Sequence, residues 1–188
     1  MDKYSNFKTL AEHEILNQDY KIQFMDIGSN MTIIAPHGGL IEPRTSLIAK
    51  LIAGNTFNYY CFEGIKKKNN RDLHITSHRF DEPGMLGLIS SCDIVVTIHA
   101  CIDTEDVIHV GGRFKELASH IQTTMEGMNI KVSRQTDRFP GTHPGNICNK
   151  ARRKKGVQLE FSRGLRDDLQ RLSTVSIAIG KALKTYPF

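Results

Sequence analysis

The sequence contains no apolar run that approaches the length of a membrane-spanning helix. Its first residues, 1–6, also lack the basic region followed by an apolar region that marks a secretory signal peptide. These two absences argue against an integral membrane protein and against conventional secretion. We therefore expect a soluble protein that is cytoplasmic as synthesised, with release by cell lysis or an unusual export route left open.

Cysteine is scarce and irregularly placed. The four cysteines are Cys61, Cys92, Cys101 and Cys148, and no two of them form a CxxC pair. Such spacing does not support a disulfide framework or a cysteine-based zinc cluster. Three of them lie in or beside apolar runs, so we predict buried, free thiols.

Positive charge exceeds negative charge, with a formal net charge of +5 and a sequence pI of about 9.0. This balance favours a polyanionic partner, which includes nucleic acid as well as an acidic polymer. The sequence has no helix-turn-helix signature, zinc finger or aromatic-rich nucleic-acid motif. A nucleic-acid-binding accessory protein therefore remains only an alternative interpretation, and the sequence does not favour it.

Segments with strand-like and helix-like patterns alternate along the 188 residues, of which 39% are hydrophobic. This length and composition predict one domain, residues 1–188, and the alternation predicts an α/β fold with a mixed, largely parallel central sheet flanked by helices. The predicted strands are residues 20–27, 31–35, 57–62, 73–76, 93–100, 107–110, 130–132 and 156–161. The predicted helices are residues 6–18, 44–53, 84–91, 113–126 and 163–184, and residues 135–155 are predicted to be irregular.

The stretch from 35 to 43 carries the clearest indication of chemistry. An apolar strand pattern ends there in a loop containing His37, two glycines and Glu42, and Pro43 suits the first position of the next helix. Strand ends that open into a glycine loop and a helix are where α/β folds place functional sites. If the loop curls back, an imidazole and a carboxylate meet, and this pair suits a divalent metal such as zinc.

Two further residues stand at the same predicted edge of the sheet. His99 ends the long apolar strand 93–100, and Glu160 lies inside the strand 156–161, where an unpartnered carboxylate is costly. Taken alone, His99 is better explained as a core-edge histidine bonded to the backbone, and Glu160 as an outward-facing strand carboxylate. Together with the first loop they fit a zinc site with two histidines, one glutamate, an open position for water and a second glutamate as general base.

Several short motifs occur in a distinctive order. They are Pro-His-Gly-Gly-x-x-Glu-Pro at 36–43, Thr-Ser-His-Arg-Phe-Asp-Glu-Pro at 76–83, the strand ending at His99, Asn-Ile-Cys-Asn at 146–149 and Gly-Val-Gln-Leu-Glu-Phe-Ser-Arg-Gly-Leu-Arg at 156–166. In this combination the chain resembles the phage-type poly-γ-glutamate hydrolases over residues 20–184. That family has a fold related to the zinc carboxypeptidases. The resemblance also implies a phage or prophage origin, with possible release on phage lysis.

The resemblance implies that His37, Glu42 and His99 hold one zinc ion and that Glu160 activates the water. In the carboxypeptidases the first histidine and glutamate stand three positions apart, whereas His37 and Glu42 stand five apart. Glu42 is therefore the ligand that the resemblance supports least firmly. His74, His78, His109 and His143 are alternative ligands or neighbours of the site, with His78 favoured because it lies in the 76–83 motif.

The implied activity is hydrolysis of the γ-glutamyl amide bonds of poly-γ-glutamate by a monomer. Candidate groups that stabilise the oxyanion or bind the free α-carboxylates of such a substrate are Arg79, Asn146, Arg163 and Arg166. Arginine binds a carboxylate through two parallel hydrogen bonds. A zinc amidohydrolase that acts on N-acyl amino acids would use a similar metal site and remains an alternative.

Overall fold

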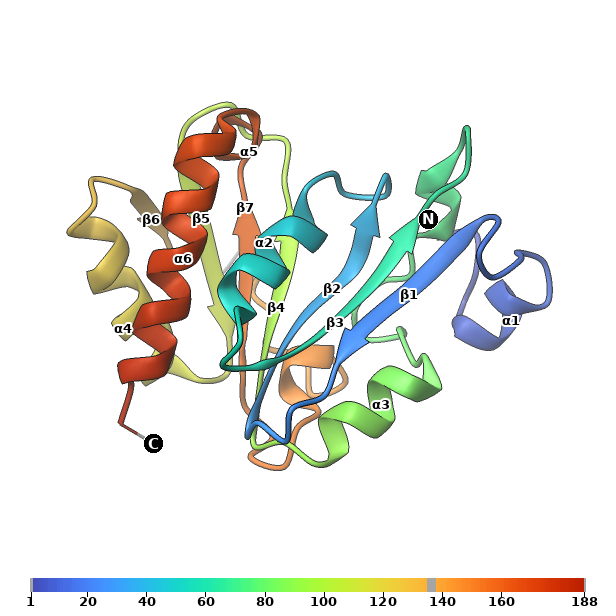
Figure 1. The fold of residues 1–188 in the computed structure, drawn as a ribbon, viewed down its shortest axis with the longest axis horizontal. Helices are drawn as coiled ribbons and strands as arrows, with labels where there is room; N and C mark the ends of the chain where they lie inside the picture. The colour runs from blue at the N-terminus through green and yellow to red at the C-terminus, as the bar shows by residue number, and fades with distance from the viewer. Residues whose placement is uncertain (1, 135–137, 188) are drawn as a thin grey trace.

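Seven strands form one mixed sheet in the order β1-β3-β2-β4-β7-β5-β6, as Figure 1 shows for this computed structural model, which describes residues 2–134 and 138–187. Four of the six strand pairings are parallel, and the β1–β3 and β5–β7 pairings are antiparallel. The predicted mixed, largely parallel sheet is therefore confirmed. The strands are β1 (Tyr20–Met25), β2 (Met31–Gly39), β3 (Asn58–Gly64), β4 (Ile94–Ala100), β5 (Val107–Gly112), β6 (Lys131–Ser133) and β7 (Val157–Phe161).

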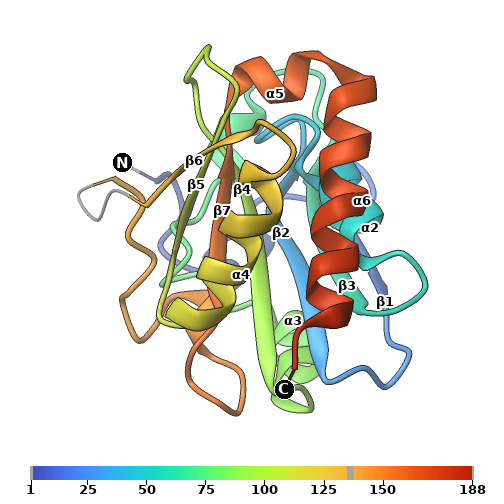
Figure 2. The same cartoon turned by 90° about the vertical axis from the view of Figure 1, so that its left-hand side faces the viewer.

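Helices cover both faces of the sheet. Helices α2, α4 and α6 lie on one face, as Figure 2 shows, and their apolar side chains join one core cluster with that face of the strands. A second cluster on the other face includes side chains of α1, α3 and both 3₁₀ helices. The helices are α1 (Phe7–Ala11), α2 (Thr45–Ala53), α3 (Pro83–Ser90), α4 (Lys115–Glu126), α5 (Arg163–Asp167), α6 (Leu169–Thr185), η1 (Asn70–Leu73) and η2 (Ile147–Asn149). Among the described residues, no helix combines the length and apolarity needed to cross a bilayer.

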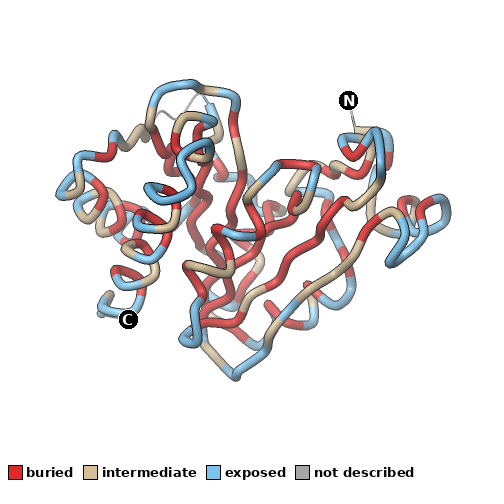
Figure 3. The backbone as a smooth tube through the Cα atoms, turned by 45° about the horizontal axis from the view of Figure 1, so that its top comes forward, coloured by how far each residue is buried: buried red, intermediate tan, exposed pale blue. Residues whose placement is uncertain are grey.

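Strand β4 shows how the two clusters fix the direction of a functional side chain. Val96 and Ile98 point into the cluster of α2, α4 and α6, whereas Val95 points into the other cluster. Both faces of the strand are covered, which explains its unbroken apolar sequence and the buried central strands in Figure 3. Because side chains alternate along a strand, His99 projects on the same face as Val95, away from the three longer helices.

Several predicted elements differ from the observed ones, and three of the differences are large. Residues 73–76 were predicted as a strand, but η1 occupies Asn70–Leu73 and His74 to Thr76 lie outside any strand. The first helix stops at Ala11 and does not reach 18. The closing helix is interrupted at Asp168, whose extended backbone (φ −96°, ψ 100°) ends α5 while its carboxylate accepts a hydrogen bond from the Arg171 amide and caps α6.

Other predictions are confirmed. Cys61, Cys92, Cys101 and Cys148 are buried and free. Within the segment predicted to be irregular, the described part contains only η2 as regular structure; residues 135–137 lie outside the described residues.

The close approach of η2 to β4 and β7 requires a glycine before β7. A Cβ atom at Gly156 would lie 1.9 Å from the carbonyl oxygen of Cys148 and 2.4 Å from that of Val95, both rigid backbone atoms. We predict that Gly156→Ala lowers the free energy of unfolding by at least about 1–3 kcal/mol because the backbones must separate. Chemical denaturation measures this effect.

The matched control is Gly87→Ala in α3, where a Cβ atom would meet no heavy atom within 4 Å. This exposed helix position should gain about 0.5–1 kcal/mol, because alanine favours the helix over glycine. Equal effects of the two substitutions would contradict the steric explanation.

Candidate metal centre

The chain between His37 and Glu42 curls back on itself, as the sequence predicted. The Glu42 amide donates to the His37 carbonyl at 2.8 Å and closes the loop. Strand β2 nevertheless continues to Gly39, past the predicted end at 35, through a register irregularity between Ala35 and Gly38. Pro36 lies in this irregularity, where its missing N–H leaves no gap in the ladder.

Gly39 is required by the same geometry. Its φ of +63° lies in the left-handed region, and a Cβ atom there would lie 2.4 Å from the Gly64 carbonyl oxygen of β3. Pro43 does not take the first helical position that was predicted, because Arg44 precedes the helix with a φ of +77° and α2 begins at Thr45. Pro43 and Arg44 therefore belong to the loop, and these two additional loop residues give Glu42 room to turn toward His37.

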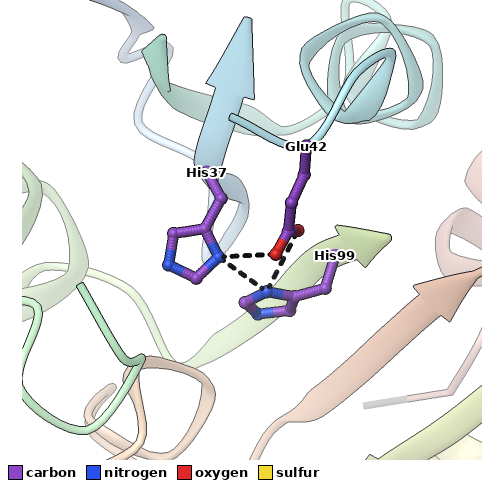
Figure 4. Close-up of side chains that lie close together, drawn as sticks. All are labelled: His37, Glu42 and His99. Carbon is purple, nitrogen blue, oxygen red and sulfur yellow. Dashed lines mark hydrogen bonds and ion pairs between the residues drawn. The ribbon is translucent and has the colours of Figure 1, made fainter. Parts of the chain in front are cut away.

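Figure 4 shows His37, Glu42 and His99 meeting at the carboxyl ends of β2 and β4. Nδ1 of His37 lies 3.2 Å from Oε1 of Glu42 and 3.2 Å from Nδ1 of His99. Nδ1 of His99 lies 3.8 Å from Oε2 of Glu42. The three residues are 2%, 9% and 3% exposed in chain order, so these atoms are shielded from solvent.

The protonation pattern of these groups fits a cation. The Ile75 carbonyl, which can only accept, lies 2.8 Å from Nε2 of His37 and assigns the ring proton to that nitrogen. Nδ1 of His37 then carries a lone pair that faces a carboxylate oxygen and a second imidazole nitrogen. Two imidazole nitrogens and a carboxylate oxygen in such contact need a proton or a metal ion between them, and this donor set is one that binds divalent metals, so the residues present fit a metal ion.

The ionisation of the other two groups is consistent with metal binding. Burial lowers the pKa of His99 to about 3 against the opposing effect of Glu42, so the ring is neutral at neutral pH. Burial alone would raise the pKa of Glu42, but positive charge on His37 and the hydrogen bond that the Ala100 amide donates to Oε2 at 2.9 Å are among the causes that lower it to about 2, and a metal ion would act in the same direction. A neutral imidazole and an ionised carboxylate are the forms that bind metals.

Glu160 lies beside this group on β7. It pairs with His99 across the parallel β4–β7 ladder and is 6% exposed. Nε2 of Gln158 donates to Oε1 of Glu160 at 3.1 Å, and Nδ2 of Asn146 donates to Oε1 of Gln158 at 2.9 Å. Burial, and then the nearby Glu42 carboxylate, raises the pKa of Glu160 well above its ordinary value.

A cavity of about 450 Å³ exposes these residues to a ligand. His37, Glu42, His99 and Glu160 line it together with residues of the 71–77 and 100–102 segments, Arg138 and Phe139. The four residues that the sequence singled out for metal binding and catalysis therefore share one cavity. The cavity also brings Arg71 and Arg138 to the site, which sequence reasoning missed.

The predicted substrate-binding residues are placed differently. Arg79 is exposed, and Arg163 makes an ion pair with Asp167 within α5; neither lines the cavity. Arg166 donates to the carbonyls of Phe161, Pro43 and Cys101, so it ties together the loops that follow β7, β2 and β4. Asn146 is buried and reaches Glu160 only through Gln158.

Of the four alternative histidines, only His74 lines the cavity. His74 stacks on His37 with ring centroids 4.0 Å apart, whereas the rings of His78 and His143 pair with each other at 4.9 Å. His109 approaches Asp103 at 2.7 Å, and Cys101 lies near both. Arg138 binds both carboxylate oxygens of Asp103, at 3.1 and 3.0 Å, so this second group is already neutralised by a cationic side chain.

Comparisons with known proteins agree with this geometry. The family model for poly-gamma-glutamate hydrolase matches residues 4–182. The SPbeta prophage-derived protein YoqZ of Bacillus subtilis is 37% identical over 163 residues, which cover 86% of this chain and 59% of YoqZ. The chain thus spans about three fifths of the length of that relative.

Two solved structures share the whole fold. A bacteriophage poly-gamma-glutamate hydrolase is 30% identical, with a TM-score of 0.93 over 99% of this chain and 98% of the other. YndL in a zinc-free apo form is 27% identical, with a TM-score of 0.91 over 98% of each chain. With a family match over nearly its full length, the chain belongs to the poly-gamma-glutamate hydrolase family.

Proposed function

We propose that the protein is a zinc-dependent hydrolase that cleaves the γ-glutamyl amide bonds of poly-γ-glutamate. The observation that carries this proposal is the convergence of three buried acceptor groups, from His37, Glu42 and His99, in one cavity with Glu160. Family membership supports the substrate class, and the description of YndL as zinc-free supports zinc as the metal.

The donor set suits a catalytic zinc site. Two imidazole nitrogens and one carboxylate oxygen are a recurrent ligand set that leaves the fourth position open. His37, Glu42 and His99 would hold the ion, with Ile75 and Ala100 fixing the orientation of two of them from behind. A bound zinc ion supplies a water of lowered pKa and polarises the amide carbonyl.

Glu160 supplies the proton transfers. Its Oε1 accepts from Gln158, which leaves Oε2 to take the proton of the attacking water. The same carboxyl then passes this proton to the departing nitrogen, which leaves as an amine as the carbon–nitrogen bond breaks.

Arg71 and Arg138 are the arginines that line the cavity, and we assign them to the substrate's α-carboxylates. Poly-γ-glutamate carries one free carboxylate per unit, which arginine binds with paired hydrogen bonds. Asp103 fixes the Arg138 guanidinium through both of its oxygens. A neighbouring cavity of about 460 Å³ shares Ile102 and Arg138 with the first and adds Lys131, which suits a chain-like substrate better than a single acyl amino acid.

Removal of the proton acceptor should stop the reaction without loss of the metal. We expect Glu160→Gln to lower kcat for poly-γ-glutamate hydrolysis by about 10²–10⁴-fold, because an amide cannot accept the proton of water. Bound zinc, measured by elemental analysis, should stay the same. Glu126→Gln is the matched control, since Glu126 is exposed at the end of α4, lines neither cavity and accepts a hydrogen bond from Gln122. Full activity of Glu160→Gln would remove Glu160 from the mechanism.

Loss of either imidazole should abolish zinc binding. We expect His37→Ala and His99→Ala to bind less than one tenth of the zinc that the unaltered protein retains after dialysis, because only two donor groups remain. His13→Ala is the control, because His13 is exposed, lies outside the cavity and places its Nδ1 2.8 Å from the Thr9 carbonyl oxygen. Unchanged zinc content in both cavity variants would refute the ligand assignment.

Substrate affinity should distinguish the arginines in the cavity from those outside it. We expect Arg138→Gln to raise KM for poly-γ-glutamate about 10-fold or more, because one charge-assisted carboxylate contact is worth about 1.5–3 kcal/mol. Arg163→Gln, on the exposed surface of α5, should leave KM unchanged. A larger effect at Arg163 than at Arg138 would restore the sequence-based assignment. Steady-state kinetics on polymer of one length measure both.

A further inference from the structure

The segment from His74 to Ser77 forms the wall behind the metal centre, although it belongs to no strand or helix. The Ile75 carbonyl accepts from Nε2 of His37 at 2.8 Å, and the Ser77 hydroxyl lies 3.4 Å from Nε2 of His99. The His74 ring packs against His37, 30° from parallel. This irregular segment therefore sets the orientation of both candidate imidazole ligands.

Asp2, which lies near the start of the sequence, holds this segment in place. Its Oδ2 accepts from the amide and from the hydroxyl of Thr76, at 2.7 and 2.6 Å. Its Oδ1 lies 2.7 Å from Nδ1 of His74. The Asp2 side chain is 12% exposed, so these three contacts are largely shielded from competing water.

Asp2 also determines which nitrogen of His74 faces the cavity. An ionised carboxylate only accepts, so Nδ1 of His74 carries the proton and Nε2 carries the lone pair. Nε2 points toward the metal centre, 3.9 Å from Oε1 of Glu42. The Asp2 carboxylate thus fixes both the tautomer and the direction of an imidazole that lies directly beside two of the proposed ligands, His37 and Glu42.

We propose that Asp2 is a positioning residue of the metal centre, which acts by holding His74 and Thr76 so that Ile75 and Ser77 orient His37 and His99. The proposal rests on the proposed function in so far as the centre binds zinc. Without the Asp2 carboxylate, the Thr76 amide loses its acceptor and the His74 ring loses the group that fixes its tautomer. The wall then shifts, and the ligand imidazoles lose their fixed directions.

Asp2→Asn tests this role with little change in shape. The Asn carbonyl can still accept from Thr76, but its NH₂ group faces Nδ1 of His74, so the imidazole proton must move to Nε2. We expect ¹⁵N NMR of the metal-free protein to show this change of tautomer. We also expect zinc affinity, measured by competition with a chromophoric chelator, to fall by about 10–100-fold.

The matched control is Asp81→Asn. The Asp81 carboxylate also ties the first residues of the chain to the body, by accepting from the Phe7 amide at 2.7 Å, but within the described part of the chain it makes no hydrogen bond or ion pair with residues 74–77. We expect thermal stability to fall in both variants and zinc affinity to fall only in Asp2→Asn. Thr76→Val, which removes one of the three contacts of Asp2, should weaken zinc binding to a smaller extent and provides a milder variant if Asp2→Asn folds poorly.

Unchanged zinc affinity in both Asp2→Asn and Thr76→Val, or an equal loss in Asp81→Asn, would overturn the proposal. Because zinc affinity is measured without substrate, failure of the two proposals can be told apart. Weakened zinc binding in Asp2→Asn with no cleavage of poly-γ-glutamate by the unaltered protein would leave the positioning role intact and refute the proposed function. Cleavage of poly-γ-glutamate by the unaltered protein, together with unchanged zinc affinity in Asp2→Asn and Thr76→Val, would support the proposed function and refute the positioning role.

Discussion

Two imidazole nitrogens and a carboxylate face one another in the interior at the ends of β2 and β4, and their need for a shared positive charge, a proton or a metal ion, is the constraint on which the site depends. Nδ1 of His37 lies 3.2 Å both from a Glu42 oxygen and from Nδ1 of His99. The Ile75 carbonyl keeps the His37 proton on the far side of the ring. A metal ion at the centre would supply this charge to all three groups, and a low-dielectric, buried position would make the attraction strong.

The fold produces this arrangement from ordinary strand geometry. Parallel strands β2, β4 and β7 end at one edge of the sheet, and alternation along each strand sends His99 and Glu160 to the face opposite α2, α4 and α6. A closely packed glycine at 39 lets β2 run beside β3 to its end before the chain turns back. Glu42 reaches His37 because this turn is closed by a backbone hydrogen bond.

Much of this was predictable from local patterns. The apolar run before His99 and the alternation around Glu160 indicated buried strands, and their parallel ends indicated one shared edge. The wrong boundaries have physical causes. Apolar residues at 73 and 75 suggested a strand. Their side chains instead pack in the core cluster on the face of α1 and α3, and the Ile75 carbonyl accepts a hydrogen bond from His37. The break at Asp168 was hidden because the apolar spacing continues on both sides of it.

Contacts between distant segments were not predictable in the same way. Arg138 reaches the cavity from a segment without a periodic pattern, and Asp2 contacts His74 across 72 positions. No local signal indicates such pairs, because loop positions are set by the finished fold. The arginines chosen from sequence motifs illustrate the same limit. Arg166 donates hydrogen bonds to three backbone carbonyls, and Arg163 forms an ion pair with Asp167 of the same helix.

The most direct test of the central claim is the anomalous diffraction of crystals grown with zinc, recorded at the zinc absorption edge. The account predicts one strong peak about 2.0–2.2 Å from Nδ1 of His37, Nδ1 of His99 and a carboxylate oxygen of Glu42. A peak bound elsewhere, or a fully loaded protein in which these three side chains do not share an ion, would contradict it.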